Sequence, residues 1–471
     1  MMTIEKDGIR FEVEDGVLFK MIPTGSINTP IDAYIPHKLN NRTKINSLGT
    51  WFCKGLYGKI TIDDEIECVQ EKAFYCAKAE TIVWSAKCLT IPEMCFYSCT
   101  AKSILNIDNV EEVGYMAFNN AAITEIKWPS CCTKVPECCF YWSCLERITN
   151  IDHVKKIDRS AFEGCRLEEF VVPAQVKTIP ESMLQSNRLL KSIVLHDNIT
   201  CIKHSAFNNT GIESIQWPSK CKRVPEYCFH NCENLVEIKL PDDIKSIGSG
   251  AFQGTKFTCF DWPSACKEIP AACFFESGIT KISFSSDITA IGKDAFIYCK
   301  ELTEIDLPDS VKTIGIRAFY KSGIKKLKWP ASCISVPTEC FAESELTEIQ
   351  FHPNVCTIGQ MAFRNCKNLM DIELPDSVRS IGNYAFKFAR FTHFKWPASC
   401  DSIPVGCFND SMIEDIVIPS HVTSIKGYSF TSCPNIKHID LSALLVCDIS
   451  KNAFRGVDRD KIAAPWYCGV A

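Results

Sequence analysis

Long apolar runs, an excess of positive charge and a leader-like segment are all missing from this sequence. No stretch approaches eighteen apolar residues, so no membrane-spanning helix is expected. Residues 1–16 carry five acidic residues and no apolar stretch, and a classical signal peptide is therefore not expected. Lys and Arg number 51 against 56 Asp and Glu, for a formal net charge of −5. A basic face for nucleic acid is not expected.

Catalytic motifs are missing too. The sequence has no G-x-x-x-x-G-K-[ST], no H-E-x-x-H and no G-x-S-x-G. Its nine histidines are scattered along the chain. The sequence therefore predicts a protein that is not an enzyme, with no cofactor and no metal site.

A single phenylalanine position recurs along almost the whole chain. Its nineteen occurrences, with Leu184 substituting once, are Phe52, Phe74, Phe96, Phe118, Phe140, Phe162, Leu184, Phe207, Phe229, Phe252, Phe274, Phe296, Phe319, Phe341, Phe363, Phe386, Phe408, Phe430 and Phe454. Every step is 22 or 23 residues except the last, which is 24. Periods of 20 to 29 residues are typical of leucine-rich repeats.

One repeat, or rung, illustrates the pattern. In Leu302-Thr-Glu-Ile305-Asp-Leu307-Pro308 the apolar residues lie two apart and proline ends the run, which predicts a short strand. The spacing of Val311 and Ile314 favours a helical or 3₁₀ turn packed on that strand. We therefore expect an α/β-type repeat solenoid, with a parallel sheet on one face and short helical or irregular segments on the other.

These residues resemble the BspA-type leucine-rich repeats, whose unit reads C-x-x-L-x-x-I-x-L-P-x-x-V-x-x-I-G-x-x-A-F. Residues 299–319 and 366–386 match this unit position by position. The resemblance covers residues 31–454, about nineteen rungs. It implies a repeat array of surface or secreted proteins that act in adhesion, and it implies no catalytic residues.

The two ends of the chain differ from the repeat. Asp15-Gly16 lies between alternating apolar residues and predicts a hairpin, so we expect residues 1–30 to cap the array. Residues 455–471, with Ala464-Pro465-Trp466-Tyr467, are expected to cover its other end.

The rungs are of two kinds. Six carry Trp where the repeat has Leu before Pro: Trp84, Trp128, Trp217, Trp262, Trp329 and Trp396. In the same rungs cysteine replaces the Val four residues later, at Cys88, Cys132, Cys221, Cys266, Cys333 and Cys400, and the Ala of Ala-Phe, at Cys95, Cys139, Cys228, Cys273, Cys340 and Cys407. Copying of blocks of rungs explains this association, and so does the volume that a large Trp requires in a dense core. The sequence does not separate the two explanations.

The 29 cysteines allow three interpretations. Because cysteine occupies core positions, the favoured one is a small buried hydrophobic residue with a free thiol. Cysteines at the same repeat position lie at least two rungs apart. Twice the strand spacing puts them roughly 9.6 Å from one another, which is beyond the ~7 Å between Cα atoms that a disulfide can bridge. A metal site would need pairs that face one another. The group Cys131, Cys132, Cys138, Cys139 and Cys144 is the best place for an exception to buried thiols.

The outward positions of the I-x-L strands form the candidate ligand-binding face. These positions are Glu304, Asp306, Lys326, Lys328, Glu348, Gln350, Asp371, Glu373, His393, Lys395, Asp415, His438 and Asp440. A merely solvated face of mixed charge is the alternative, and the sequence leaves it open.

The resemblance implies a surface adhesin or antigen-like protein that recognises protein or glycan ligands, including host or extracellular-matrix proteins. The cell surface or the extracellular space is the location implied. The alternative is a cytosolic protein–protein interaction scaffold, which the missing signal peptide and the many cysteines favour.

Overall fold

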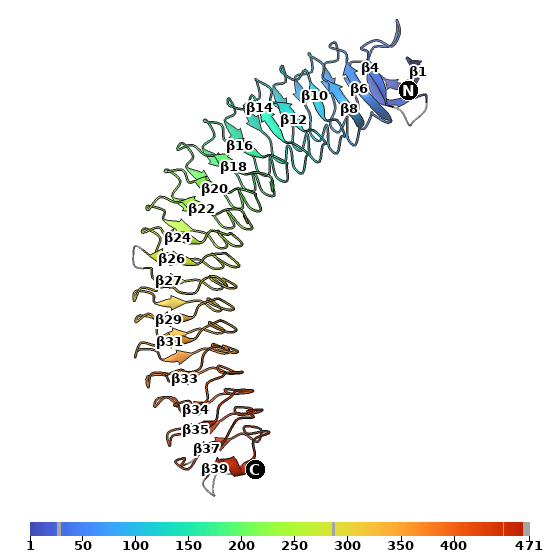
Figure 1. The fold of residues 1–471 in the computed structure, drawn as a ribbon. Coiled ribbons are helices and arrows are strands. Elements are labelled where there is room, and N and C mark those ends of the chain that lie inside the picture. Colours follow the sequence, from blue (N-terminus) through green and yellow to red (C-terminus); the bar gives the residue numbers. More distant parts are fainter. Residues whose placement is uncertain (26–29, 285–287, 446, 465–471) are drawn as a thin grey trace. The chain divides into compact units, whose positions relative to one another are not determined.

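The computed structural model describes residues 1–25, 30–284, 288–445 and 447–464. Two compact units make up the chain, Met1–Lys239 and Leu240–Ala471, called here unit 1 and unit 2. Both are stacks of rungs with the same plan (Figure 1). None of the helices in these ranges is long and apolar enough to cross a membrane.

Each rung contributes one strand to the second of two columns, and most rungs contribute one to the first. Turns separate the columns, and a further turn carries the repeating phenylalanine. The I-x-L segments form the first strand column. In unit 1 its members are β4 (Ile31–Ile35), β6 (Leu56–Ile62), β8 (Lys78–Val83), β10 (Ser103–Leu105), β12 (Glu125–Lys127), β14 (Arg147–Thr149), β16 (Glu169–Val171), β18 (Ser192–Val194), β20 (Ser214–Gln216) and β22 (Glu237–Lys239). In unit 2 they are β24 (Cys259–Trp262), β26 (Lys281–Phe284), β29 (Lys326–Lys328), β31 (Glu348–Gln350), β35 (Asp415–Val417), β37 (His438–Asp440) and β39 (Ile462–Ala463).

The second strand column consists of two-residue strands. In unit 1 these are β5 (Ser47–Leu48), β7 (Cys68–Val69), β9 (Thr90–Ile91), β11 (Glu112–Val113), β13 (Lys134–Val135), β15 (Lys156–Ile157), β17 (Thr178–Ile179), β19 (Cys201–Ile202) and β21 (Arg223–Val224). In unit 2 they are β23 (Ser246–Ile247), β25 (Glu268–Ile269), β27 (Ala290–Ile291), β28 (Thr313–Ile314), β30 (Ser335–Val336), β32 (Thr357–Ile358), β33 (Ser380–Ile381), β34 (Ser402–Ile403), β36 (Ser424–Ile425) and β38 (Asp448–Ile449).

This second column corrects one expectation. The segment from Val311 to Ile314 is not helical, because Thr313–Ile314 is strand β28. A single turn closes through the Val311 N–H on the Pro308 carbonyl, and the chain then pairs with the preceding rung, where Gly315 N–H donates to Ile291 O at 2.8 Å. One helix occurs among the described residues, the 3₁₀ turn η1 (Arg459–Lys461).

The repeating phenylalanines stack through the interior of each unit. Neighbouring ring centroids lie 5.1 Å apart for Phe118 and Phe140 and 5.5 Å apart for Phe296 and Phe319, with planes within 6° of parallel. The rings are fully buried, and offset stacking of this kind is favourable for aromatic pairs. The backbone follows the same stacking: Phe118 N–H donates to Cys139 O at 2.9 Å in the next rung, and Phe319 N–H to Cys340 O at 3.0 Å.

Pairing in the second column is interrupted at regular places, and proline is the cause. In a repeat where glycine follows the two-residue strand, the glycine N–H donates to the preceding rung, as Gly114 N–H does to Ile91 O at 2.8 Å. A side chain is excluded at Gly114, since a Cβ there would lie 2.5 Å from Glu93 N. Where proline follows the strand, as at Pro136 and Pro180, that N–H does not exist. Each such rung therefore begins a new sheet.

The resulting blocks differ between the units. In unit 1 the sheets β9–β11, β13–β15 and β17–β19 hold two strands each. In unit 2 the sheets β25–β27–β28, β30–β32–β33 and β34–β36–β38 hold three. The change from two strands to three matches the sequence spacing of the rungs in which cysteine precedes the repeating phenylalanine. This spacing is 44 residues from Cys95 to Cys139 and 67 residues from Cys273 to Cys340.

The chain begins with three antiparallel strands, β1 (Met2–Lys6), β2 (Ile9–Glu14) and β3 (Val17–Pro23). Asp15 and Gly16 form the turn between β2 and β3 with φ of 48° and 80°, which suits a tight hairpin. Strand β3 pairs in parallel with β5, at the edge of the second column. Of the expected carboxy-terminal cover, Pro465, Trp466 and Tyr467 lie outside the described residues.

Candidate functional site

The predicted ligand-binding positions all lie along the first column of unit 2, either in its strands or in the equivalent segments of rungs that have no strand there. The parallel register of neighbouring strands places many of them side by side: Lys326 pairs with Glu348, Lys328 with Gln350, and Asp415 with His438. Single bridges extend the two groups, from Glu304 to Lys326 and from His393 to Asp415. The site residues are thus gathered into one group on residues 304–350 and another on residues 393–440.

Two members of the predicted set stand between these groups. Asp371 and Glu373 are exposed, but the segment that carries them has no strand. The core residues beside them, Ile372 and Leu374, are nevertheless buried as the I-x-L pattern predicts.

Most of the predicted side chains point into solvent. The side chains of Lys395 and Lys328 are 84% and 69% exposed, whereas Leu327, which precedes Lys328 in β29, is only 4% exposed. Asp415 and Asp440 are half-buried. Asp440 also has a structural contact with Ser442. Hydrogen bonds from the Ser442 side chain and from its backbone N–H, the latter at 2.8 Å, lower the pKa of the Asp440 carboxyl.

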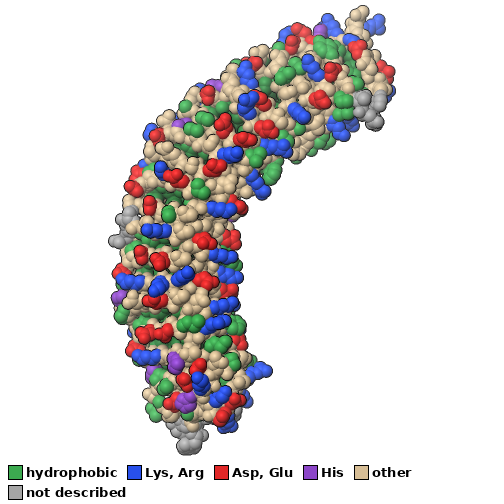
Figure 2. Space-filling view, in the orientation of Figure 1, with side chains coloured by type: hydrophobic (Ala, Val, Ile, Leu, Met, Phe, Trp, Pro, Cys, Tyr) green, Lys and Arg blue, Asp and Glu red, His purple; other side chains and the backbone are tan. Residues whose placement is uncertain are grey.

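Opposite charges meet between neighbouring rungs on this face. Lys326 Nζ lies 3.0 Å from Glu348, and this contact raises the pKa of the lysine. His393 lies 3.6 Å from Asp415. Basic and acidic side chains alternate along unit 2 in the space-filling view (Figure 2). Because these groups are exposed, solvent screens their pairing and leaves them available to a partner.

The tryptophan rungs share one hydrogen bond that the sequence does not display. In all six, the indole N–H donates at 2.8–2.9 Å to the backbone carbonyl of the cysteine four residues later, as Trp329 does to Cys333. Both the indole and this carbonyl are buried. The bond gives a physical reason for Trp at this position, since a buried carbonyl needs a donor.

The predicted burial of cysteine in the Trp rungs is confirmed. Cys273 and Cys340 are fully buried, and burial raises the pKa of both thiols well above the usual range. In the group singled out as an exception, Cys132, Cys138 and Cys139 are buried, Cys144 is half-buried and Cys131 is exposed, each as a free thiol. The parts of the chain that the structure describes contain no cluster of three or more His, Cys, Asp or Glu residues fit for a metal ion.

A further set of buried cysteines has a role that the sequence analysis missed. Cys299 Sγ donates to Phe274 O at 2.8 Å, and Cys366 Sγ to Phe341 O at 3.0 Å. Burial raises the pKa of both thiols to about 12. The set comprises Cys165, Cys232, Cys299, Cys366 and Cys433. Their uniform spacing of 67 residues was the available signal.

The comparisons with known proteins agree with this architecture. The BspA type leucine-rich repeat region, in six copies, matches residues 39–146, 111–236, 222–345 and 334–459. No curated protein sequence matches the chain. A leucine-rich repeat protein from Bacteroides ovatus ATCC 8483 is 21% identical, with 93% of this chain and 94% of that chain covered and a TM-score of 0.52, which shows a likeness of fold alone.

A leucine rich cell surface protein from Faecalibacterium prausnitzii A2-165 is 19% identical over 97% of this chain and 98% of that chain. Its TM-score of 0.33 is too low to carry an argument. The repeat family is generally non-enzymatic. Since the family match spans nearly all of the rungs, the chain belongs to the BspA-type leucine-rich repeat family.

Proposed function

We propose that this protein binds protein or glycan ligands through the exposed first-column face of unit 2. The observation that carries the proposal is the register of that face. Polar and charged side chains of neighbouring rungs are aligned there in regular rows on a backbone that the buried phenylalanine stack holds in place. Repeat solenoids commonly use extended surfaces of this kind for recognition.

The chemistry of the face suits polar partners. Lysine and histidine donate, carboxylates and Gln350 accept, and the exposed lysines extend well away from the backbone. Such groups contribute more to partner selection and association rate than to affinity alone. A protein surface or a glycan rich in hydroxyl and carboxylate groups would match them.

A cell-surface location is part of the proposal, and family membership supports it. The buried thiols favour a second candidate, a scaffold in a reducing cytosol. Labelling of intact cells with a membrane-impermeant reagent separates the two. Labelled protein supports the surface adhesin, and labelling only after lysis supports the scaffold.

The ends of the array complete the proposal. We infer that residues 1–30 cap the first rungs, because β3 occupies an edge of the second column that would otherwise expose backbone groups. Residues 455–471 would cover the opposite end, where β39 pairs with β37.

The binding proposal is tested with a panel of immobilised extracellular-matrix proteins and glycans. The test variant changes Lys326, Lys328, His393 and Lys395 to Glu. Because these side chains are exposed, circular dichroism and thermal melting should change little. Binding to the panel members that the natural protein recognises should fall, with the association rate and its salt dependence changed most.

A matched control reverses lysines of the same unit on its second column: Lys245, Lys267 and Lys312 to Glu. All three are exposed. Arg317 is unsuitable as a control because it forms two hydrogen bonds to Asp294. Loss of binding in the control, with retention in the first-column variant, would place the recognition surface on the other side of the rungs and refute the proposal.

A further inference from the structure

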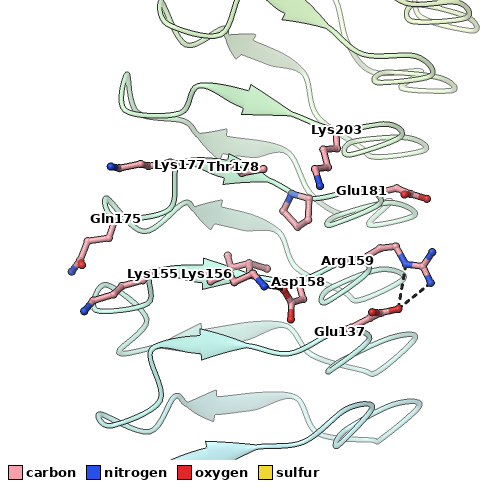
Figure 3. Close-up of a pocket in the computed structure, with 12 residues that line it drawn as sticks. Glu137, Lys155, Lys156, Asp158, Arg159, Gln175, Lys177, Thr178, Glu181 and Lys203 are labelled. Carbon is pink, nitrogen blue, oxygen red and sulfur yellow. Dashed lines mark hydrogen bonds and ion pairs between the residues drawn. The ribbon is translucent and has the colours of Figure 1, made fainter.

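A basic depression lies on the second strand column of unit 1, a different column from the one that carries the proposed binding face. It occupies the interruption between β15 and β17, where Pro180 cannot pair with the preceding rung, and has a volume of about 690 Å³. In Figure 3 Lys155 and Lys177 extend from the same side of neighbouring rungs, and Lys203 approaches from the next rung. Cations of three successive rungs therefore line one open surface, with Lys155 and Lys177 on one side of it and Lys203 on the other.

The positive charges here outnumber the negative ones. With Lys134 at its edge, the depression carries six cations and three carboxylates. Asp158 is shared, since Lys134 lies 2.7 Å and Lys156 2.9 Å from it. Glu137 pairs with Arg159 at 2.9 Å. The remaining carboxylate, Glu181, adds its charge near Arg159.

Three of the lysines have their charge available. Lys155, Lys177 and Lys203 are exposed, and no ion pair involves them within the described ranges of the chain. Lys155 and Lys177 occupy equivalent positions on adjacent rungs, about 4.8 Å apart along the stack. Lys203 lies on the following rung, three residues beyond Thr200, which is the position equivalent to Lys177. A hollowed surface with one sign of charge in excess concentrates counter-ions of the opposite sign.

We propose that this depression, through Lys155, Lys177 and Lys203, binds a linear sulfated polysaccharide that crosses successive rungs. Lysine clusters of this kind are typical of heparin-like ligands. Lysine acts as a compact point charge that needs no planar partner, and a flexible sulfated chain can place one anionic group beside each ammonium. The repeating charges of the ligand would then follow the repeating rungs of the protein.

Nucleic acid fits the surface less well. None of the twelve residues that line the depression is aromatic, whereas single-stranded nucleic acids are held by bases stacked on aromatic rings. Reading duplex DNA usually requires a helix or a β-ribbon that enters a groove. The described part of unit 1 has no helix that could enter a groove.

The test measures binding of the purified full chain to dextran sulfate, unsulfated dextran of equal length and duplex DNA of similar charge. We expect dextran sulfate to bind at 0.1 M salt and to be released at 1 M, where the screening length falls to about 3 Å. Lys155→Glu, Lys177→Glu and Lys203→Glu combined should weaken this binding at least about tenfold. Replacement of the same three lysines by Gln removes charge without adding repulsion, so it should weaken dextran sulfate binding by a smaller factor. The circular dichroism spectrum of the Gln variant should be unchanged.

Two controls separate this site from the rest of the molecule. Reversal of Lys245, Lys267 and Lys312 matches the number and strand column of the changed lysines but lies in unit 2, and should leave dextran sulfate binding unchanged. The first-column variant at Lys326, Lys328, His393 and Lys395 should also leave it unchanged, so this inference and the proposed function fail separately.

Four results would overturn the inference: no binding of dextran sulfate, equal binding of unsulfated dextran, tighter binding of duplex DNA, or an equal loss of binding when the unit 2 lysines are reversed.

Discussion

The indole hydrogen bond of the Trp rungs can be tested at Trp329. This side chain is fully buried, its N–H donates to Cys333 O at 2.8 Å, and its ring packs edge-on against Phe341 at 5.9 Å. The substitution Trp329→Phe keeps an aromatic ring at the site and removes the donor. The Cys333 carbonyl would then be buried without its partner.

The cost has two parts. An unsatisfied buried polar group costs about 1–3 kcal/mol. The smaller ring also leaves space for roughly two methylene-sized groups, at about 0.8 kcal/mol each. Together these amount to about 2.6–4.6 kcal/mol. Since about 1.4 kcal/mol corresponds to a tenfold change in an equilibrium, local opening of the rung should become roughly a hundredfold to a thousandfold more frequent.

Hydrogen–deuterium exchange read by mass spectrometry measures this opening rung by rung. Peptides that contain residues 325–340 should exchange faster in the variant, and the equivalent peptide around Trp128 in unit 1 should not, because rungs are coupled chiefly to their neighbours. An acceleration of no more than about fourteenfold near Cys333, which the lost ring volume alone would produce, would show that the indole N–H contributes little, and the hydrogen-bond explanation of the Trp rungs would be refuted.

The cysteines supply three further predictions. Denatured protein alkylated without reductant should reveal close to 29 thiols, and native protein should react slowly at most of them; many unreactive cysteines in the denatured chain would contradict the buried-thiol interpretation. Cys273→Leu should overpack its site and cost about 1–3 kcal/mol in urea unfolding, more than Cys273→Ala, and the reverse order would refute the volume argument. The pKa values of Cys165, Cys299 and Cys366 are raised to about 12, so only the unfolded chain loses these protons just above pH 9. Stability should therefore be complete below pH 9 and fall between pH 9 and 12, by roughly 1.4 kcal/mol per thiol at pH 10; equal urea midpoints at pH 7 and pH 10 would contradict this.

The positions of the core could be predicted from the sequence because the period is strict. Phe319, Leu327 and Cys340 are buried as their repeat positions predict. The local structure between Val311 and Ile314 could not, since a spacing of three fits both a helical turn and a β-turn followed by a short strand. Bonds between rungs decide in favour of the strand, and these depend on residues about 22 positions away.

Features that depend on backbone atoms or on neighbouring rungs could not be predicted from the sequence for a similar reason. The acceptor for Trp329 is the carbonyl of Cys333, which no residue type reveals. The prolines that follow second-column strands, such as Pro136 and Pro180, can be read from the sequence, but their effect on pairing depends on how the rungs stack. The net charge of −5 gives no indication of a local basic surface, and the grouping of Lys155, Lys177 and Lys203 becomes apparent only when the rungs are aligned. The binding role of the first-column face remains a prediction.

The central claim is that recognition takes place on the first-column face of unit 2, and an exchange footprint of the ligand-bound protein tests it most directly. A protein or glycan selected from the immobilised panel is added in excess, and deuterium uptake is compared with that of the free chain. We expect protection of peptides that cover residues 304–306, 326–328, 348–350, 393–395 and 438–440, with little change in the phenylalanine turns. Protection confined to the second column or to the turns, with the first column unchanged, would contradict it.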